Sequence, residues 1–310
     1  MRTLLLVLCC CCSLPLFAQK SICITIDDLP FISQKRETEW IEKQTHKLLL
    51  TLQEFGVPAI GFVNERKLEN KGEILPERVA LLEAWLMAGM ELGNHTYSHP
   101  DYHRISFEEF KADLRKGEPQ TMMLQAQYGQ TMTYFRHPFL HTGESPEKQA
   151  QLREYLDQAG YTVAPVSMDN SEWIFARAYE NAYLASDPNM MEKIGQAYVT
   201  YMMEQAAYYE GQAQDLFGRE IRHILLIHAN LLNADYLDEL LAALQEKEYQ
   251  FISLEDALMD EAYQSEDQYT GRGGISWLHR WALTQEVGKG FFAGEVRCPQ
   301  FVQEVAEIVE

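Results

Sequence analysis

Positive charge is scarce in this sequence. Its 310 residues include 26 lysines and arginines against 46 aspartates and glutamates, so the formal net charge is −20. Nonspecific binding to nucleic acid or to an anionic membrane needs clustered positive charge. The composition therefore argues against both of these partners, whereas a neutral substrate, a cation or a metal ion remains compatible with it.

Cysteine is nearly absent after the first twelve residues. Four of the six cysteines lie at positions 9–12, and only Cys23 and Cys298 follow. One possible bridge does not make a disulfide framework, and the sequence leaves open whether these two cysteines pair. Stability must come from a hydrophobic core, which a chain of this length with 46% hydrophobic residues can build.

Long hydrophobic runs are missing beyond the start of the chain. Residues 1–18 combine one positive charge, at Arg2, with an apolar run too short to span a bilayer comfortably. We predict a signal peptide cleaved after Ala18, and hence a secreted or periplasmic protein without a stable membrane span. A lipid anchor at Cys9 is less favoured, because the residue before such a cysteine is usually small and Leu8 is not.

Short β-rich runs and amphipathic helical patterns alternate along the rest of the chain. This alternation predicts a parallel sheet closed or nearly closed into an α/β barrel, with the chemistry at the carboxyl ends of the strands. The expected strands are 21–27, 59–63, 90–93, 131–135, 161–167, 221–227 and 249–252, and the expected helices are 39–55, 76–88, 106–127, 145–159 and 234–247, with a short one from Leu254.

Two segments depart from this alternation. Residues 174–218 are rich in alanine, methionine, tyrosine and glutamine, and they predict an inserted pair of helices. Residues 262–310 contain several aromatics, and we interpret them as a C-terminal extension packed on the barrel, with an aromatic platform for sugar as the alternative. The expected organisation is a signal peptide (1–18), a barrel domain (19–261) that includes the helical insertion, and this extension.

Two adjacent carboxylates, Asp27 and Asp28, end the first predicted strand. Side chains alternate along a strand, so Cys23, Thr25 and Asp27 share one face and the isoleucines take the other. Unpaired buried carboxylates are costly, so these two should face water, cap a helix or bind a cation. Taken alone, an N-cap or a solvated turn is the simpler interpretation.

Two histidines, His95 and His99, follow the third predicted strand. Positions i and i+4 meet on one face of a helical turn, which is the spacing that two imidazoles need to chelate one divalent ion. Such pairs also occur as polar surface or as satisfied core groups. The pair by itself leaves both interpretations open.

Polar or ionisable residues follow three further predicted strands. A lone arginine, carboxylate or histidine is usually structural. In a parallel barrel, however, the ends of the strands converge on a single mouth, and this shared position favours one site. These residues are Arg136 and His137 after 131–135, Asp169, Asn170, Ser171 and Glu172 after 161–167, and His228 at the end of 221–227.

The ordered set of clusters resembles the polysaccharide deacetylase family, which comprises carbohydrate esterases built on a NodB-type domain. The resemblance covers about residues 20–260. It implies an α/β fold, a distorted (β/α) barrel of the NodB type, and a metal-dependent deacetylase acting on a carbohydrate substrate. The motifs that carry it are Thr25-Ile26-Asp27-Asp28, His95-Thr96-Tyr97-Ser98-His99, Arg136-His137-Pro138, Asp169-Asn170-Ser171-Glu172-Trp173 and Leu226-Ile227-His228.

The resemblance also implies a metal site and two proton carriers. Asp28, His95 and His99 would bind a divalent metal, with zinc the first choice and cobalt or nickel as alternatives. Three protein ligands with open positions suit a catalytic zinc. Asp27 would act as the general base, and His228 as the acid that protonates the leaving group.

The remaining motif residues would support these two proton carriers and the substrate. Arg136 would hold Asp27 ionised and aligned. Glu172, with Asp169 as the substitute candidate, would orient His228 and raise its pKa. The residues expected to contact substrate are Pro138, Phe139, Trp173 and Leu226.

Two positions depart from the family pattern. Leu29 stands where the family usually has glycine, and we expect its bulk beside the metal to alter the substrate groove. Glu172 replaces an aspartate, so its longer side chain should move the partner of His228. Neither change removes a proposed ligand or proton carrier, so we expect an active enzyme.

Two alternative functions remain open. The same catalytic set could act on a small non-peptide C–N bond, or the protein could be a carbohydrate-binding relative that has lost turnover. Of the other histidines, His103 and His141 fall in loops near the predicted mouth, where they could touch substrate. The sequence specifies neither the sugar nor the oligomeric state.

Overall fold

The computed structural model describes residues 20–35 and 37–310, so the predicted signal peptide and the alternative lipid anchor lie outside the described residues. Within this range the strands form one large sheet and one small hairpin. The sheet strands are β1 (Ser21–Ile32), β2 (Ile60–Val63), β5 (Glu91–Asn94), β6 (Tyr134–Phe135), β7 (Thr162–Val163), β8 (Arg222–Asn230) and β9 (Gln250–Phe251), and the hairpin strands are β3 (Glu69–Asn70) and β4 (Glu73–Ile74).

Helices follow most of the strands. The long ones begin with proline or with a residue that follows a polar cap, as the local sequence predicts. They are α1 (Thr38–Glu54), α2 (Pro76–Met87), α3 (Phe107–Lys116), α4 (Pro119–Gln127), α5 (Pro146–Ala159), α6 (Glu172–Leu184), α7 (Pro188–Phe217), α8 (Leu231–Glu246), α9 (Leu254–Leu258), α10 (Trp277–Thr284) and α11 (Gln300–Ala306).

The sheet is parallel and curls until its two edges nearly meet. Its order is β7-β6-β5-β2-β1-β8, with β9 paired to the start of β1. The segment 162–168 begins as β7 at one edge and reaches β8 at the other, where Leu226 N donates to Met168 O (3.3 Å). A single parallel bridge joins Met168 to Leu225. The predicted α/β fold is confirmed, in the form of a curled half-barrel.

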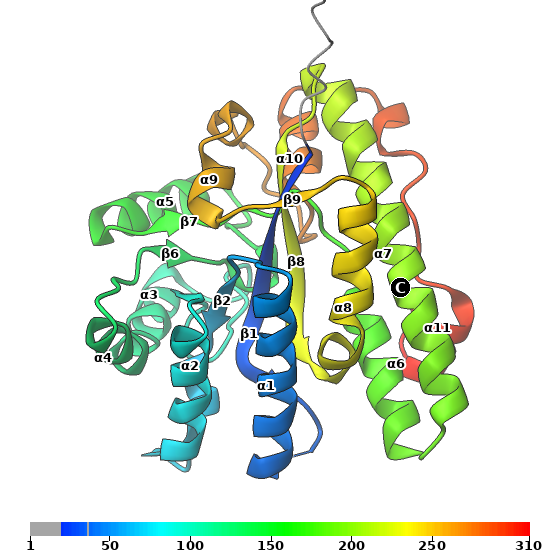
Figure 1. Ribbon diagram of the computed structural model, residues 1–310. Coiled ribbons are helices and arrows are strands. Elements are labelled where there is room, and N and C mark those ends of the chain that lie inside the picture. The colour runs from blue at the N-terminus through cyan, green and yellow to red at the C-terminus, as the bar shows by residue number, and fades with distance from the viewer. Residues whose placement is uncertain (1–19, 36) are drawn as a thin grey trace, which may run out of the picture.

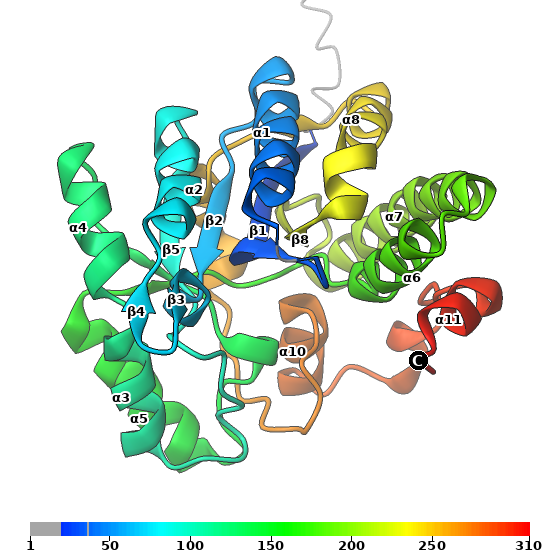
Figure 2. The ribbon, with the colours of Figure 1, turned by 90° about the horizontal axis from the view of Figure 1, so that it is seen from below.

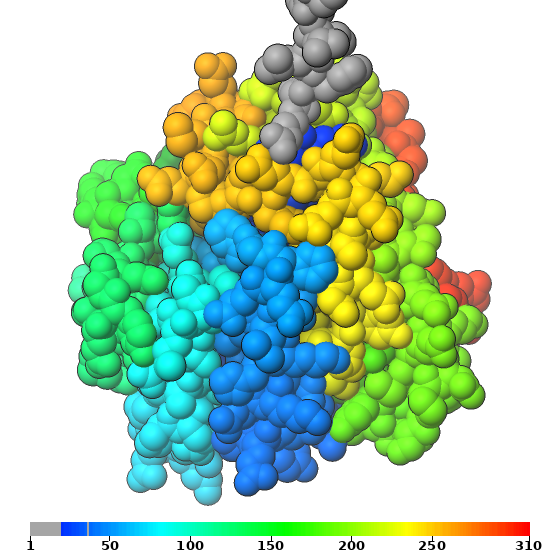
Figure 3. All heavy atoms as spheres, in the orientation of Figure 1, coloured from blue at the N-terminus to red at the C-terminus, as the bar shows by residue number. Residues whose placement is uncertain are grey.

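Helices α1, α2 and α8 cover one face of this sheet, as Figures 1 and 2 show from two sides. Their outer surfaces close over the strands in Figure 3, with α1 in blue, α2 in cyan and α8 in yellow. No helix within the described residues is both long enough and apolar enough to cross a membrane.

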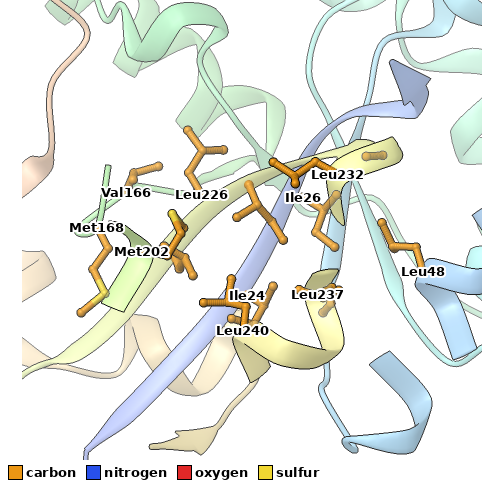
Figure 4. Packing of buried hydrophobic residues seen from close by; sticks show 14 of the residues in the cluster. Ile24, Ile26, Leu48, Val166, Met168, Met202, Leu226, Leu232, Leu237 and Leu240 are labelled. Carbon is orange, nitrogen blue, oxygen red and sulfur yellow. The ribbon is translucent and has the colours of Figure 1, made fainter. Parts of the chain in front are cut away.

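Alternation along β1 decides which side chains enter the main core. Ile22, Ile24 and Ile26 join the largest buried cluster, whereas Cys23 packs in a separate cluster, as the strand pattern predicted. In Figure 4, Ile24 and Ile26 lie among leucines of α1 and α8. Each such burial contributes about 1.5–3 kcal/mol to stability. Cys23 and Cys298 are both buried and free, so they form no bridge.

One expected helix is two helices. Ser106 caps α3 through a capping box with Glu109, as predicted. The helix expected over 106–127 breaks, however, because Gly117 ends α3 and Pro119 begins α4. Proline has no N–H to continue a hydrogen-bonded turn, so it starts a helix more readily than it extends one.

The residues after α9 fold back onto the helices of the 174–218 segment. Helix α10 packs against α7, and α11 packs against α6. Trp277 and Trp281 are 7% and 1% exposed, so these two tryptophans serve packing and do not form an aromatic platform. The buried hydrophobic residues of α6 and α7 belong to the main core cluster, so this helical pair is part of the core.

Gly274 packs directly against the loop that follows β6. A Cβ added there would lie 1.8 Å from the carbonyl oxygen of Phe139, a backbone atom. We therefore expect Gly274→Ala to lower the free energy of unfolding by about 1–3 kcal/mol. Gly273→Ala is the matched control, since its Cβ would meet only side-chain atoms at 3.4 Å or more. Urea denaturation measures both variants, and equal losses would contradict this packing.

Candidate active site

A cavity of about 730 Å³ opens at the carboxyl ends of the strands. Parallel strands place the residues that follow them at the same end of a sheet, so motifs far apart in sequence meet there. The predicted site residues that line it are Asp27, Asp28, His95, His99, Phe139, Asp169, Trp173, Leu226 and His228.

Three potential ligand atoms converge in this cavity. Asp28 Oδ1 lies 3.7 Å from His95 Nε2 and 3.8 Å from His99 Nε2. These separations are too long for hydrogen bonds, and they are close to the spacing of about 3.4 Å between two ligands of one tetrahedral ion. Asp28 Oδ1 is buried and has no hydrogen-bond partner among the described residues. The three residues therefore fit a divalent metal.

His95 and His99 meet through a loop, so the prediction that they lie on one helical turn is wrong. His95 N donates to Val63 O, and Thr96 and His99 adopt positive φ angles of 67° and 59°. The two rings lie 4.8 Å apart. His95 Nδ1 lies 2.8 Å from Arg136 O, so Nδ1 carries the proton and Nε2 faces the carboxylates.

Lys67 fixes the other side of Asp28. Its Nζ donates to Asp28 O (2.6 Å) and lies 3.4 Å from Asp28 Oδ2. Burial favours the neutral acid, but Lys67, His99 and His95 outweigh burial and lower the pKa of Asp28 below its ordinary value. Asp28 is thus a carboxylate with one oxygen directed at the histidines. Sequence reasoning missed Lys67, which lies outside every motif.

Asp27 occupies a more enclosed position. It is 3% exposed, with Oδ2 3.6 Å from His95 Nε2 and 3.9 Å from Arg136 Nη1. Burial raises the pKa of Asp27 to about 6, and Arg136 and His228 oppose that rise in part. A carboxylate with this pKa is ionised at neutral pH and accepts a proton more readily than an exposed aspartate.

His228 lines the cavity from β8, where it lies beside Asp27 in the strand register, and it is held by Glu172. Glu172 Oε2 lies 2.7 Å from His228 Nδ1, while Oε1 accepts from Asn230 Nδ2 (2.5 Å) and Asn233 Nδ2 (2.7 Å). Burial lowers the pKa of His228, but Glu172 outweighs burial, and the result is a pKa of about 9. The imidazole is therefore protonated at neutral pH and can donate a proton.

The raised pKa of His228 makes stability depend on pH. The folded form holds this proton more tightly than an ordinary histidine with a pKa of 6.5, so the stabilisation is complete below pH 6.5 and is lost as pH rises toward about 9. We expect the Tm of the chelator-treated protein to fall over that interval, and Glu172→Gln to flatten the fall. Glu204→Gln, at an exposed position of α7, is the control. The same slope in both variants would contradict the Glu172–His228 coupling.

Comparison with known proteins identifies the domain. The sequence model of the family described as polysaccharide deacetylase matches residues 17–164. The chain carries a polysaccharide deacetylase domain. Members of this family are generally hydrolases that act on non-peptide C–N bonds and are typically metal-dependent, and the Asp28, His95 and His99 group fits that character.

A solved structure shares the fold of this deacetylase domain. A mutant of BA3943, a CE4 family pseudoenzyme from Bacillus anthracis, is 18% identical with a TM-score of 0.51, over 78% of this chain and 68% of that chain. A family 4 carbohydrate esterase from Streptomyces lividans in complex with acetate is 19% identical with a TM-score of 0.47, over 77% and 95% of the two chains. An uncharacterised 30.6 kDa protein from the fumA 3′ region of Geobacillus stearothermophilus is 28% identical over 221 residues, which is 71% of this chain and 68% of that protein.

Of the other residues predicted for the deacetylase site, some line the cavity and others are buried in the core. Phe139 and Trp173 are 52% and 50% exposed at the cavity, and Leu226 lines it with little exposure. Pro138 is buried and does not line the cavity, so its expected contact with substrate is not supported. Asp169 lines the cavity, where burial raises its pKa to about 7, while the carboxylate that contacts His228 belongs to Glu172.

Leu29 does not change the groove, contrary to the sequence-based expectation. Its side chain is fully buried and does not line the cavity. A Cβ added to Gly61 would lie 2.2 Å from Leu29 Cδ1, so the absent side chain at Gly61 provides the room that Leu29 occupies. Leu29, which replaces the family glycine, therefore packs in the core and leaves the cavity unchanged.

Several residues that line the cavity were not predicted. They come from α7 and from the C-terminal segment, whose sequence carries no recognisable motif. Their carboxylates add to those of the motifs, so acidic side chains outnumber basic ones around the cavity. These residues are Tyr201, Gln205, Glu295, Val296, Arg297 and Glu310.

Proposed function

We propose that this protein is a secreted, metal-dependent deacetylase that removes N-acetyl groups from a carbohydrate. One observation carries the proposal: the Asp28, His95 and His99 group, the Asp27 carboxylate and the His228 acid all line a single cavity. Zinc suits a site of one carboxylate and two imidazoles.

The residues of the chain can perform the proton transfers of amide hydrolysis. A bound divalent ion would polarise the acetyl carbonyl and lower the pKa of a water molecule beside it. Asp27, with its raised pKa, would accept the proton of the attacking water. His228 would then donate its proton to the nitrogen of the leaving amine, since an amine must be protonated to leave. Glu172 would hold the His228 ring in place for this transfer.

The charge of the cavity supports an uncharged sugar as substrate. Asp27, Asp28, Asp169, Glu295 and Glu310 line it, against Arg297 and the protonated His228. With a divalent ion bound, the negative and positive charges nearly balance, so the cavity has no large excess charge to attract a charged polymer. Protonated His228 favours an N-acetyl over an O-acetyl group, because an amine needs that proton more than an alcohol does. Secretion, as the signal peptide predicts, would bring the protein to extracellular or cell-wall sugars.

Acetate release tests the proposal. The zinc-loaded full chain is incubated with chitin oligomers, peptidoglycan fragments and acetylated xylan, with cobalt and nickel forms in parallel. We expect acetate from the N-acetylated substrates, at a rate that a chelator abolishes. Release from small acetamides alone would favour a hydrolase of small C–N bonds. Binding of the oligomers without any release would instead favour a relative that has lost turnover.

A further inference from the structure

A second cluster of ionisable side chains lies at the rim of the cavity. Potential ligand atoms of Asp101, His103 and His141 lie within 4.8 Å of one another, and His141 lines the cavity. The ring of Phe139 lies 4.4 Å from the His99 ring and 5.8 Å from the His141 ring. The Phe139 ring thus lies between His141 and His99, which is one of the three residues that fit a metal.

The geometry of this cluster differs from that of the Asp28, His95 and His99 group. Asp101 Oδ1 lies 2.7 Å from His141 Nδ1, which is the length of a hydrogen bond and too short for two ligands of one ion. The rings of His103 and His141 are stacked, with centroids 3.9 Å apart and an interplanar angle of 2°. Ring nitrogens direct their lone pairs within the ring plane, so two stacked imidazoles cannot both aim at one ion.

Asp101 instead fixes the orientation of His141. Asp101 Oδ1 also accepts from His103 N (2.9 Å), and Arg104 Nε lies 3.1 Å from Asp101 Oδ2. The carboxylate is therefore an acceptor, and His141 Nδ1 carries the proton that it accepts. In the neutral ring this leaves Nε2 of His141 as an acceptor. The rings of His103 and Phe139 hold the imidazole from the sides.

We propose that His141 Nε2 accepts a hydrogen bond from a hydroxyl of the sugar unit next to the one whose acetyl group is removed. The inference rests on the proposed function and makes His141 a specificity-determining residue for an oligosaccharide. The cavity that His141 lines has a volume of about 730 Å³, which leaves room for such a substrate. The exposed rings of Phe139 and Trp173 offer faces for sugar.

Two substitutions at His141 separate its two nitrogens. Asparagine places a donor near Nδ1, so His141→Asn keeps the bond to Asp101 and loses the group in the cavity. Glutamine places a polar atom near Nε2, so His141→Gln keeps part of that group. His46→Asn, at an exposed histidine of α1, is the matched control.

The probes are N-acetylglucosamine and its tetramer, with the zinc-loaded full chain. We expect His141→Asn to raise KM for the tetramer about 3- to 10-fold, as the loss of one hydrogen bond would, with kcat and the monosaccharide rate unchanged. His141→Gln should recover part of the loss. The Kd of the tetramer, measured by calorimetry in an Asp27→Asn background, should rise by the same factor.

The outcomes separate this inference from the proposed function. If His141→Asn behaves as His46→Asn does while the parent releases acetate, the inference is wrong and the function stands. If no variant releases acetate but His141→Asn still weakens tetramer binding, the inference stands and the function fails. Two tightly bound zinc ions in the parent, reduced to one in His141→Asn, would make the cluster a metal site and overturn the inference, as would a parent that does not bind the tetramer.

Discussion

Asp27→Asn should reduce kcat for acetate release by about 10²- to 10⁴-fold, which is the usual contribution of a general base. Asparagine has nearly the same shape as aspartate but cannot accept the proton of water at neutral pH. The carboxylate is 3% exposed, and its Oδ1 has no hydrogen-bond partner among the described residues. An amide in its place therefore breaks no hydrogen bond of Oδ1.

Measurements of bound zinc and of the rate of acetate release together test this prediction. The Asp27→Asn variant should still bind one zinc ion, because the Asp28, His95 and His99 group is intact. Asp157→Asn, at an exposed position of α5, is the matched control and should retain full activity. Unchanged turnover in Asp27→Asn would remove Asp27 from the mechanism, whereas loss of zinc would mean that Asp27 is itself a ligand.

His99→Gln should weaken zinc binding by more than about 100-fold, since it removes one of three ligands and residues around a metal site already contribute 10–100-fold. His99 is only partly buried, and within residues 20–35 and 37–310 its ring forms no hydrogen bond to another residue, so the variant should remain folded. Acetate release should fall with the bound metal. Competition with a chromogenic chelator measures the affinity, and circular dichroism checks the fold.

His46→Gln serves as the control for the His99 variant, because it makes the same change at an exposed histidine. Its zinc affinity and activity should match those of the parent. Tight zinc binding that survives His99→Gln would place the metal elsewhere. The Asp101, His103 and His141 cluster would then be the first site to examine.

Local sequence signals predicted much of the fold. Alternation along 21–27 separated Ile24 and Ile26 from Cys23, and the capping box at Ser106 marked the start of α3. Pro119 was an available signal for the break between α3 and α4, and it was overlooked. These features depend on neighbours in sequence, so periodicity and capping rules can find them.

Features that depend on contacts between distant residues could not be predicted from local sequence patterns. The loop of His95 and His99 is shaped by hydrogen bonds such as His95 N to Val63 O, so the i and i+4 spacing suggested the wrong local structure. Leu29 turns into the core only because Gly61, on the next strand, leaves room. Lys67 contacts Asp28, and Glu295 lines the cavity, although both come from segments without a motif.

The central claim is that Asp28, His95 and His99 hold one catalytic metal ion. Anomalous diffraction at the zinc absorption edge, from a crystal grown with stoichiometric zinc, tests it most directly. The account predicts one strong peak within about 2.0–2.2 Å of Asp28 Oδ1, His95 Nε2 and His99 Nε2. A peak at any other place, or no peak beside these three atoms, would contradict it.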